Sequence, residues 1–344
     1  MESEPRHILV LHIAGLTETI LALPALRSLR RRLPNARITV LAGASAAGLL
    51  AMVDEIDEVL PIGRFRNAEL LKPTLLLRES RSIRALRREP FDLALEFKHN
   101  AESNLLLRLV NPAARRAGSG RRGGVEAALE RIRGNLARRT EPPPHVAQQY
   151  LRRLEPWDVR PIESAPRLFP HPEANARIER LLEKHGVRSG ELLVGIHPGA
   201  GTGKPRWPLA RFASIGARLI HNFNARAILL AGPNERGLAK RLAALLPARR
   251  SIVLESPRFP EWVSIAARLS LFVGHVGGPA HLAAAAGAPV VALSNAVDFS
   301  PHDLLGPRIA QLRAPHIELI SEEAVYESAS KLLQMNRAEA LRAV

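Results

Sequence analysis

Two adjacent glycines, Gly277 and Gly278, follow an apolar run at 271–273 and precede an alanine-rich segment and a second apolar run. This pattern is typical of a buried strand, a tight turn and a helix. In an open α/β sheet, ligands bind just beyond the carboxyl ends of the strands. Free N–H groups and the positive end of the helix dipole suit a phosphate or a pyrophosphate there. The alternative is a tight turn that binds nothing.

A second glycine-rich loop, residues 198–208 just after His197, carries the cations Lys204 and Arg206. It is not a Walker A motif, because Pro198 stands where the first glycine belongs and Pro205 replaces the hydroxyl that would hold Mg²⁺. The two cations could still neutralise a diphosphate leaving group. The alternative is a solvated basic loop.

Two glutamates follow expected strands at positions where a carboxylate could act. Glu235 comes just after the strand expected at 226–231 and could accept hydrogen bonds from both ribose hydroxyls of a nucleotide. Glu18 lies in the first turn of the first helix, where the helix dipole favours the ionised form of a general base. Either carboxylate could simply complement a helix N-terminus. His145 and His281 could both be structural, and no metal site is predicted because no His, Asp or Glu group has metal-ligand spacing.

Strands and helices alternate along the whole chain, which indicates an α/β protein with mostly parallel sheets covered on both faces. The first helix is expected to begin at Thr17 as its N-cap, with a kink or a break at Pro24. Further elements are expected over the following segments: strands at 7–12, 37–41, 58–61, 91–97, 192–197, 226–231, 251–254 and 271–273, and helices at 68–88, 101–110, 146–154, 209–221, 234–246 and 260–269.

The chain is long enough for two domains of similar size. We expect a first domain at 1–160, a proline-rich linker at 161–172, a second domain at 173–320 and a final helical segment at 321–344. The arginine-dense stretch 113–139 shows no periodicity and is expected to be irregular. The cleft between two such domains is the default site for a ligand.

Composition excludes several classes of protein. The chain has 344 residues, no cysteine and no apolar stretch long enough to cross a bilayer, and its first residues do not resemble a signal peptide. We therefore expect a cytoplasmic protein without a signal peptide. The formal net charge of +16 favours anionic partners such as a phosphorylated glycolipid or a membrane face. Aromatic residues make up only 4%, and no base-reading motif is present, so nucleic acid is not an expected partner.

Several segments, in this order and spacing, resemble glycosyltransferase family 9, the ADP-heptose:lipopolysaccharide heptosyltransferases. The similarity runs over nearly the whole chain. The segments are 21–26 with Leu29 (similar to L-T-L-P-A-L…L), 91–100 (Y-D-L-V-I-D-L-Q-G-N), His145 with Tyr150-Leu151 (H…Y-L), 197–200 with 206–208 and 211–212 (H-P-G-A…K-R-W-P…R-F), and 278–283 (G-P-M-H-L-A).

The resemblance implies a GT-B fold, in which two Rossmann-like domains face each other across a cleft. It implies an inverting transfer of a heptose or a related sugar from ADP-heptose, or another nucleotide sugar, to a lipopolysaccharide core or similar anionic glycan. It also implies peripheral contact with the cytoplasmic face of the inner membrane and a final helix that packs back on the first domain. No cofactor is obligatory, and assistance by Mg²⁺ stays open.

The resemblance assigns roles to individual residues of this chain. Glu18 takes the position of the catalytic base, and Lys204 serves the leaving group. The donor-binding residues are then Gly199, Ala200, Arg206, Glu235, Gly277, Gly278 and His281. The acceptor-binding residues are Lys98, Asn100, Arg121, Arg122 and His145.

Four departures from the family pattern concern the site itself. Glu18 replaces an aspartate, which moves the carboxylate by about one methylene and can alter the rate. Lys204 lies one position early relative to Trp207. Val276-Gly277 stands where the family has Asp-Thr, and 294–298 replaces F-G-P-T-D. Val276 and the altered segment 294–298 motivate an alternative function, a non-catalytic GT-B descendant that binds an anionic glycolipid or a membrane surface.

Overall fold

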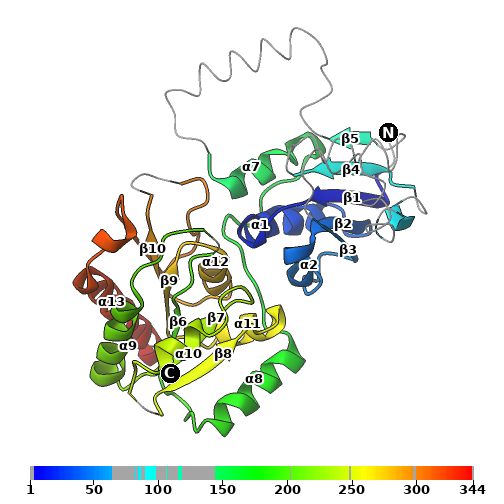
Figure 1. Cartoon of the computed structure of the whole chain (residues 1–344). Coiled ribbons are helices and arrows are strands. Elements are labelled where there is room, and N and C mark those ends of the chain that lie inside the picture. Colours follow the sequence, from blue (N-terminus) through cyan, green and yellow to red (C-terminus); the bar gives the residue numbers. More distant parts are fainter. Residues whose placement is uncertain are drawn as a thin grey trace. The chain divides into compact units, whose positions relative to one another are not determined.

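The computed structural model describes residues 4–63, 82, 84–86, 90–97, 106, 115–117, 144–201, 203–247, 249–296 and 300–342. The chain forms two compact units, Met1–Ser164 and Ala165–Val344, each with its own parallel sheet (Figure 1). The boundary falls inside the proline-rich segment 161–172 that the sequence analysis predicts as a linker. Each unit is described below by itself.

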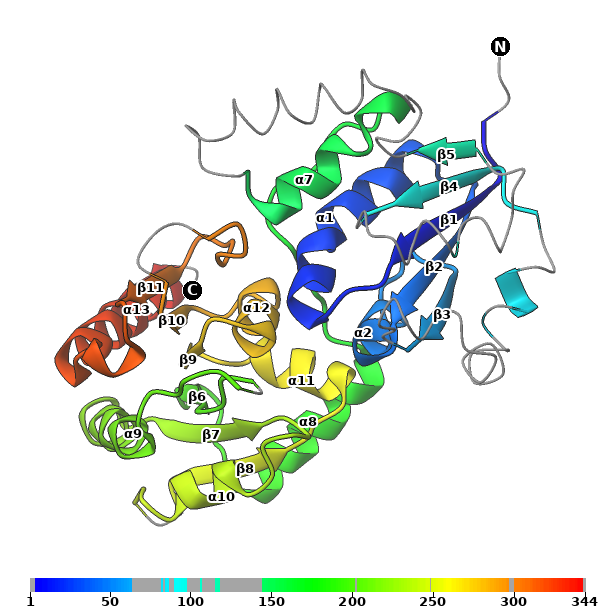
Figure 2. The same cartoon turned by 45° about the horizontal axis from the view of Figure 1, so that its top comes forward.

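The first unit is built on a five-stranded sheet in the order β3-β2-β1-β4-β5, and all of its pairs are parallel. The central strand β1 lies between β2 and β4 because its apolar run is buried on both faces. Helices α1 and α7 pack against each other beside this sheet (Figure 2). The strands are β1 (His7–His12), β2 (Arg37–Gly43), β3 (Glu58–Ile62), β4 (Leu93–Glu96) and β5 (Arg115–Ala117), and the helices are α1 (Leu16–Arg32), α2 (Ala44–Leu50) and α7 (Val146–Arg152).

The second unit has a six-stranded parallel sheet in the order β11-β10-β9-β6-β7-β8. One face packs on α9, α10 and α13, and the other face packs on α11 and α12, with α8 lying against α11. The strands are β6 (Leu193–His197), β7 (Arg226–Ala231), β8 (Ser251–Glu255), β9 (Leu271–His275), β10 (Val290–Ser294) and β11 (Ile309–Arg313). The helices are α8 (Pro172–Lys184), α9 (Leu209–Phe223), α10 (Leu238–Ala243), α11 (Phe259–Ala266), α12 (Gly278–Ala285) and α13 (Glu322–Arg342).

The start of the first helix differs from the prediction. The N-cap of α1 is Gly15, not Thr17, and no side chain caps the helix. Pro24 does not break α1, which continues to Arg32. The missing N–H of Pro24 removes one helical hydrogen bond, while the Ser28 hydroxyl donates to the Pro24 carbonyl at 2.8 Å.

Strand β5 lies inside the stretch 113–139 that we expect to be irregular, so this prediction is wrong for Arg115–Ala117. Three residues are too few to show an alternating pattern, and main-chain pairing with β4 does not require one. The rest of that stretch, and most of the helices predicted at 68–88 and 101–110, lie outside the described residues.

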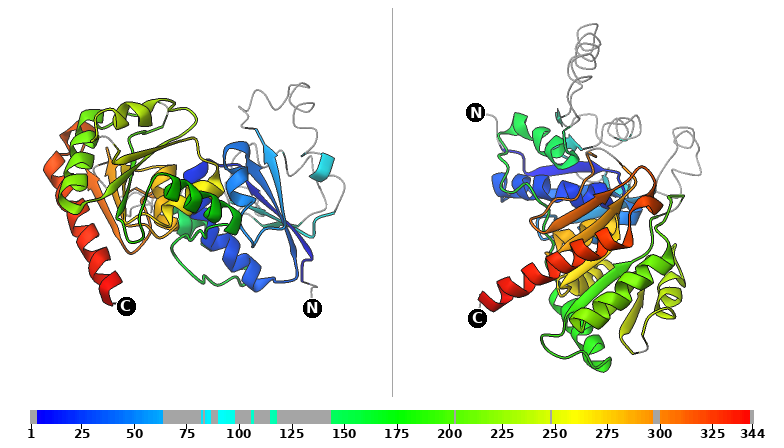
Figure 3. Two further views of the ribbon diagram at one scale, coloured as in Figure 1. Left: turned by 90° about the horizontal axis from the view of Figure 1, so that it is seen from below. Right: turned by 90° about the vertical axis from the view of Figure 1, so that its left-hand side faces the viewer.

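The final helix, α13, packs on α9 and on strands β9 to β11 of its own unit (Figure 3). Val325, Ala329 and Leu333 are buried in this contact. A contact of this helix with the first domain stays a prediction. In the described part of the chain, no helix combines the length and the hydropathy needed to cross a membrane.

Candidate functional site

Three neighbouring strands of the second sheet end at one edge and bring distant parts of the sequence together. The order β9-β6-β7 places His275, His197 and Ala231 at this edge, because each is the last residue of its strand. The chain runs from β6 to β7 on one side and later returns to β9 on the other, so β6 marks the point where the strand order reverses. Such a switch point is where open α/β sheets bind ligands.

Glu235 is held in the turn after β7 by three hydrogen-bond donors. Its Oε2 lies 3.1 Å from His197 Nε2 and accepts from the Gly232 amide at 3.1 Å, and its Oε1 accepts from the Gly201 amide at 3.3 Å. Burial opposes ionisation, but the hydrogen bond and charge of His197 together with the two amides outweigh it and hold the pKa of Glu235 at about 2. The carboxylate is therefore charged at neutral pH.

Gly199 is a glycine because the Glu235 carboxylate occupies the space of a side chain. A Cβ at this position would lie 1.9 Å from Glu235 Oε1 and 2.2 Å from Oε2. The carbonyl of Gly199 also faces two imidazole rings, with His197 Nδ1 at 3.2 Å and His275 Nδ1 at 2.9 Å. This residue therefore joins the ends of β6 and β9 to the turn that carries Glu235.

His275 connects the two ends of the 198–208 loop. Its Nε2 accepts a hydrogen bond from the Trp207 amide at 2.8 Å, so this nitrogen carries no proton. Its Nδ1 faces the Gly199 carbonyl and must therefore carry one. Burial lowers the pKa of His275 to about 4, which agrees with this neutral tautomer. We refer to His197, Gly199, Trp207, Glu235 and His275 as the carboxyl-edge cluster.

The indole of Trp207 fixes the far end of the same loop. It is buried, its Nε1 donates to the Ile320 carbonyl at 2.9 Å, and its ring meets Phe212 edge-on at 5.0 Å. Between the two anchored ends, Lys204 and Arg206 are exposed and Ala200 is half-buried. The predicted cations are thus presented on a loop whose ends are tied to the sheet.

The turn after β9 leaves open space beside its backbone. Gly277 is the N-cap of α12 in an extended conformation, and a Cβ built on it would meet no atom within 4 Å. The conformation alone does not require glycine at 277. Pro279, in the first turn of α12, lacks an N–H, so the amides of Gly278 and Ala280 are the donors that this turn can offer.

His281 and the end of β10 lie beside that turn, where the Val276 amide donates to the Leu293 carbonyl at 2.8 Å. The His281 side chain is buried in α12, and its Nε2 is 3.1 Å from the His302 carbonyl. Ser294, the last residue of β10, accepts from the Ala296 amide at 3.1 Å. Positions 297 and 298 lie outside the described residues.

In the first unit, Glu18 lies half-buried in the first turn of α1. The Tyr150 ring of α7 stacks on Phe97 at 5.4 Å and meets His12 edge-on at 5.4 Å. Burial raises the pKa of the Tyr150 phenol, and the negative charge of Glu18 raises it further. These residues gather at the carboxyl ends of β1 and β4, where the sheet places a ligand site by the same rule.

Of the five predicted acceptor-binding residues, the structure describes only His145. His145 is buried as the N-cap of α7, where its Nδ1 accepts from the Ala147 amide at 3.2 Å. Lys98, Asn100, Arg121 and Arg122 lie outside the described residues. Among the described residues, no group of His, Asp and Glu side chains is placed to hold a metal ion.

His275 belongs to no motif of the sequence, and His197 and Tyr150 occur only as parts of motifs. The available signal was that 271–273 and 192–197 both read as strands with a histidine at or just after the end. What it lacked was the pairing of β6 with β9, which sets His197 opposite Gly274.

A family model for glycosyltransferase family 9 (heptosyltransferase) matches residues 80–326, well over half of the chain. The chain belongs to glycosyltransferase family 9. Lipopolysaccharide heptosyltransferase 3 of Escherichia coli is 24% identical over 291 residues, which cover 82% of this chain and 81% of that protein.

Solved structures of this family share the fold. A family 9 glycosyltransferase from Veillonella parvula has a TM-score of 0.78 at 19% identity, covering 97% of this chain and 99% of the other. The E. coli ADP-heptose lps heptosyltransferase II has a TM-score of 0.72 at 20% identity, covering 96% and 99%. E. coli heptosyltransferase WaaC with ADP has a TM-score of 0.72 at 16% identity, covering 95% and 99%. The chain therefore has the GT-B fold of the heptosyltransferases, as the resemblance implies.

Proposed function

We propose that this family 9 glycosyltransferase moves a heptose or a related sugar from ADP-heptose, or another nucleotide sugar, to a lipopolysaccharide core or similar anionic glycan. The observation that carries the proposal is the meeting of Gly199, Glu235 and the open Gly277 turn on three neighbouring strands. The E. coli relatives, named as heptosyltransferases, one of them with ADP, support this choice of donor.

On the donor side, Glu235 receives the ribose. Its Oε2 already accepts two hydrogen bonds and its Oε1 one, so among the described donors Oε1 has a place for one further hydroxyl. The amides of Gly278 and Ala280 and the dipole of α12 receive the diphosphate in the open space beside Gly277. Gly199 and Ala200 border this site, and His281 supports the turn from inside α12.

The transfer itself is an inverting displacement. Glu18 takes the proton of the acceptor hydroxyl, and the oxygen forms a bond to the anomeric carbon. The bond from that carbon to the diphosphate oxygen breaks on the opposite face, and its electron pair leaves with the nucleoside diphosphate. Lys204 and Arg206, both exposed on the 198–208 loop, neutralise the charge that develops on the leaving group.

The acceptor binds to the first unit through Lys98, Asn100, Arg121, Arg122 and His145. The cations Lys98, Arg121 and Arg122 complement acidic and phosphorylated sugars. The net charge of +16 favours such an acceptor at the cytoplasmic face of the inner membrane. The reaction as proposed has no obligatory cofactor, and assays with and without EDTA will test whether Mg²⁺ assists it.

A panel of nucleotide sugars tests the proposal. A donor that binds the folded protein raises its melting temperature by ligand linkage, so ADP-heptose should give a saturable shift that ADP-glucose, UDP-glucose and GDP-mannose match less well or not at all. The best donor is then incubated with purified lipopolysaccharide acceptors, and the anomeric configuration of the product is read by NMR. Binding of acceptor without any nucleotide-sugar shift would instead support a non-catalytic descendant.

A further inference from the structure

A second polar hollow lies at the opposite edge of the second sheet from the carboxyl-edge cluster. It has a volume of about 1220 Å³, and its lining includes Glu191, Arg226 and Ser270, which lie at or just before the amino-terminal ends of β6, β7 and β9. The cluster lies at the other end of the same strands. The five residues of β6 span about 13–17 Å, so the hollow is separate from the proposed donor site.

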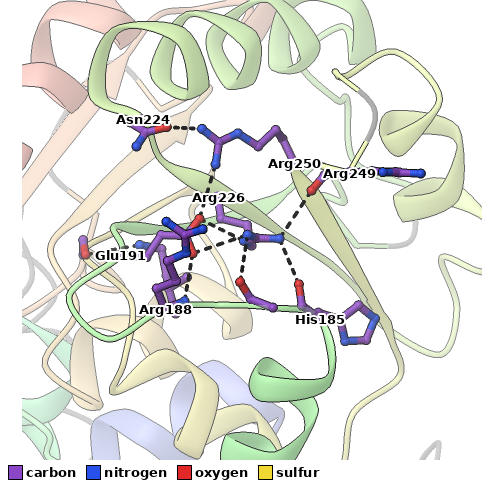
Figure 4. Close-up of polar contacts among 10 residues, drawn as sticks. His185, Arg188, Glu191, Asn224, Arg226, Arg249 and Arg250 are labelled. Carbon is purple, nitrogen blue, oxygen red and sulfur yellow. Dashed lines mark hydrogen bonds and ion pairs between the residues drawn. The ribbon is translucent and has the colours of Figure 1, made fainter.

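Arg226 and Glu191 form the fixed floor of this hollow (Figure 4). Arg226 Nε donates to Glu191 Oε1 at 3.0 Å, and its two terminal nitrogens donate to the carbonyls of His185, Gly186 and Arg249 at 3.1 to 3.3 Å. Both side chains are nearly buried, at 12% and 10% exposure. Burial opposes ionisation of Glu191, but Arg226 outweighs it and lowers the pKa of this carboxyl. Both groups therefore stay charged, and the Arg226–Glu191 pair carries no net charge.

Two further arginines leave the hollow with surplus positive charge. Arg250 Nη1 lies 3.4 Å from Glu191 Oε1, and its Nη2 donates to Asn224 Oδ1 (Figure 4). Arg188 donates to Glu191 only through its main-chain amide, at 3.1 Å. The Arg188 side chain is exposed, and among the described residues no ion pair engages its guanidinium. The hollow is thus lined by three arginines, Arg188, Arg226 and Arg250, and by one carboxylate, Glu191, which Arg226 already pairs with.

Two residues beside the hollow have left-handed backbone conformations, which is ordinary for the asparagine at the end of α9 but not for the arginine. Asn224 and Arg249 have φ values of 51° and 63°, and an arginine in the left-handed region is uncommon. The Arg250 side chain follows directly from this turn, and the Asn224 side chain binds it. Backbone strain of this kind persists where the surrounding structure enforces it, and it is frequent at ligand sites.

We propose that this hollow is a binding site for a phosphate group, with Arg188 and Arg250 as its cations. Guanidinium groups recognise phosphate through paired hydrogen bonds. Glu191, which Arg226 holds in place, in turn contacts the Arg250 guanidinium and the main-chain amide of Arg188. The Ser270 hydroxyl accepts from the Leu193 amide at 3.4 Å and keeps its own proton to donate. The phosphate belongs either to a soluble compound or to a lipid headgroup.

The test uses the full chain, with inorganic phosphate as the probe and saturating ADP present to occupy the proposed donor site. We compare the wild type with Arg188→Gln and with the double variant Arg188→Gln/Arg250→Gln. The matched control is Arg180→Gln/Arg241→Gln, which removes the same charge from exposed positions of helices α8 and α10 that do not line the hollow. Sedimentation with phosphatidylglycerol vesicles, against phosphatidylcholine vesicles, tests the lipid source.

We expect saturable binding by the wild type and the control, and a dissociation constant at least about tenfold higher in the double variant. The shift in melting temperature caused by ADP should be the same in all four proteins, whatever its size. Binding to phosphatidylglycerol alone, lost in the double variant, would identify a lipid headgroup as the source.

Three results would overturn the proposal. In the first, the wild type binds neither inorganic phosphate nor phosphatidylglycerol vesicles. In the second, both arginine variants bind the probe as tightly as the wild type does. In the third, the double variant loses the ADP-induced shift in melting temperature together with phosphate binding. The Arg188→Gln variant keeps the test decisive if the double variant unfolds, because this change breaks no ion pair of the described residues. Failure of the donor panel in turn leaves the arginine comparison intact, so the two proposals fail separately.

Discussion

The main-chain N–H of Trp207 donates a hydrogen bond of 2.8 Å to Nε2 of His275, 68 residues further along the chain. The same imidazole contacts the Gly199 carbonyl through its Nδ1 at 2.9 Å. One buried side chain at the end of β9 thereby anchors both ends of the loop that presents Lys204 and Arg206. The geometry of that loop depends on a residue outside it.

Replacement of His275 should therefore loosen the 198–208 loop. Phenylalanine leaves the buried Trp207 amide without an acceptor, which costs about 1–3 kcal/mol, whereas glutamine offers both an acceptor and a donor and should retain part of the stability. We expect a lower melting temperature for His275→Phe than for His275→Gln, and a weaker ADP shift in the same order. The exposed His171→Gln serves as control. Equal stability of His275→Phe and the wild type would show that the loop does not need this anchor.

The neutral state of His275 predicts a loss of stability in mild acid. Its pKa is about 4 in the folded protein, below the ordinary value of 6.5, so the unfolded chain takes up the proton first as the pH falls. The stabilisation is complete above pH 6.5 and declines as the pH falls from there to about 4. Between pH 7 and pH 5 we expect this group to cost about 2 kcal/mol of the free energy of unfolding.

Urea unfolding at the two pH values measures that difference. The His275→Gln variant lacks the titrating ring and should show a smaller loss than the wild type. An identical loss in both proteins would assign the effect to other groups. Glu235 affects stability in a lower pH range, because its pKa is about 2 in the folded protein against an ordinary value of 4.5. Its contribution to the free energy of unfolding is complete above pH 4.5 and is lost as the pH falls toward 2.

Loss of the Glu235 charge should affect both stability and nucleotide binding. In Glu235→Gln the amide cannot accept from His197, Gly232 and Gly201 together, since one of its terminal atoms is an NH₂ donor. We expect a lower melting temperature and about a tenfold loss of ADP affinity by calorimetry, because a charged hydrogen bond to ribose is removed. Glu183→Gln, at an exposed position on α8, should change neither. Unchanged ADP affinity in Glu235→Gln would remove this residue from the donor site.

Two glycine-to-alanine changes should separate folding from ligand binding. At Gly199 a methyl group would overlap the Glu235 carboxylate, so Gly199→Ala should lower the melting temperature markedly. At Gly277 the backbone is extended and the space is open, so Gly277→Ala should fold as the wild type does. If the diphosphate occupies that space, Gly277→Ala should nevertheless reduce the ADP shift. An undiminished shift would place the diphosphate elsewhere.

Substitution of Glu18 tests the proposed general base. Glu18→Gln keeps the shape of the side chain but cannot accept the proton, so turnover should fall about 10²- to 10⁴-fold. The nucleotide-sugar shift should stay, since Glu18 belongs to the first unit and the donor residues to the second. Glu18→Asp should retain more activity than Glu18→Gln. Full turnover by Glu18→Gln would exclude this carboxylate from proton transfer.

Sequence patterns predict most strands well, though not β5 or β11, and they predict the helix ends less well. The bounds of β1 and β7 agree with the predicted 7–12 and 226–231, because buried parallel strands are short apolar runs with clear limits. The sequence predicts a helix over 234–246, whereas α10 spans Leu238–Ala243. The segment before it forms a turn instead, in which the Glu235 side chain accepts from the Gly232 amide. A side chain engaged in this way gives no signal in hydrophobic periodicity.

Apolar runs and family motifs are local patterns, so the sequence alone determines the family and most of the strands and helices, although not α2, α8, β5 or β11. The contacts between residues of the site, in contrast, join positions that are distant in the sequence. His275 contacts Gly199 and Trp207 because β9 lies beside β6 in the sheet. Glu235 contacts His197 because β7 lies on the other side of β6. Only the tertiary structure decides these contacts, because hydrogen bonding between parallel strands sets which strand ends share an edge.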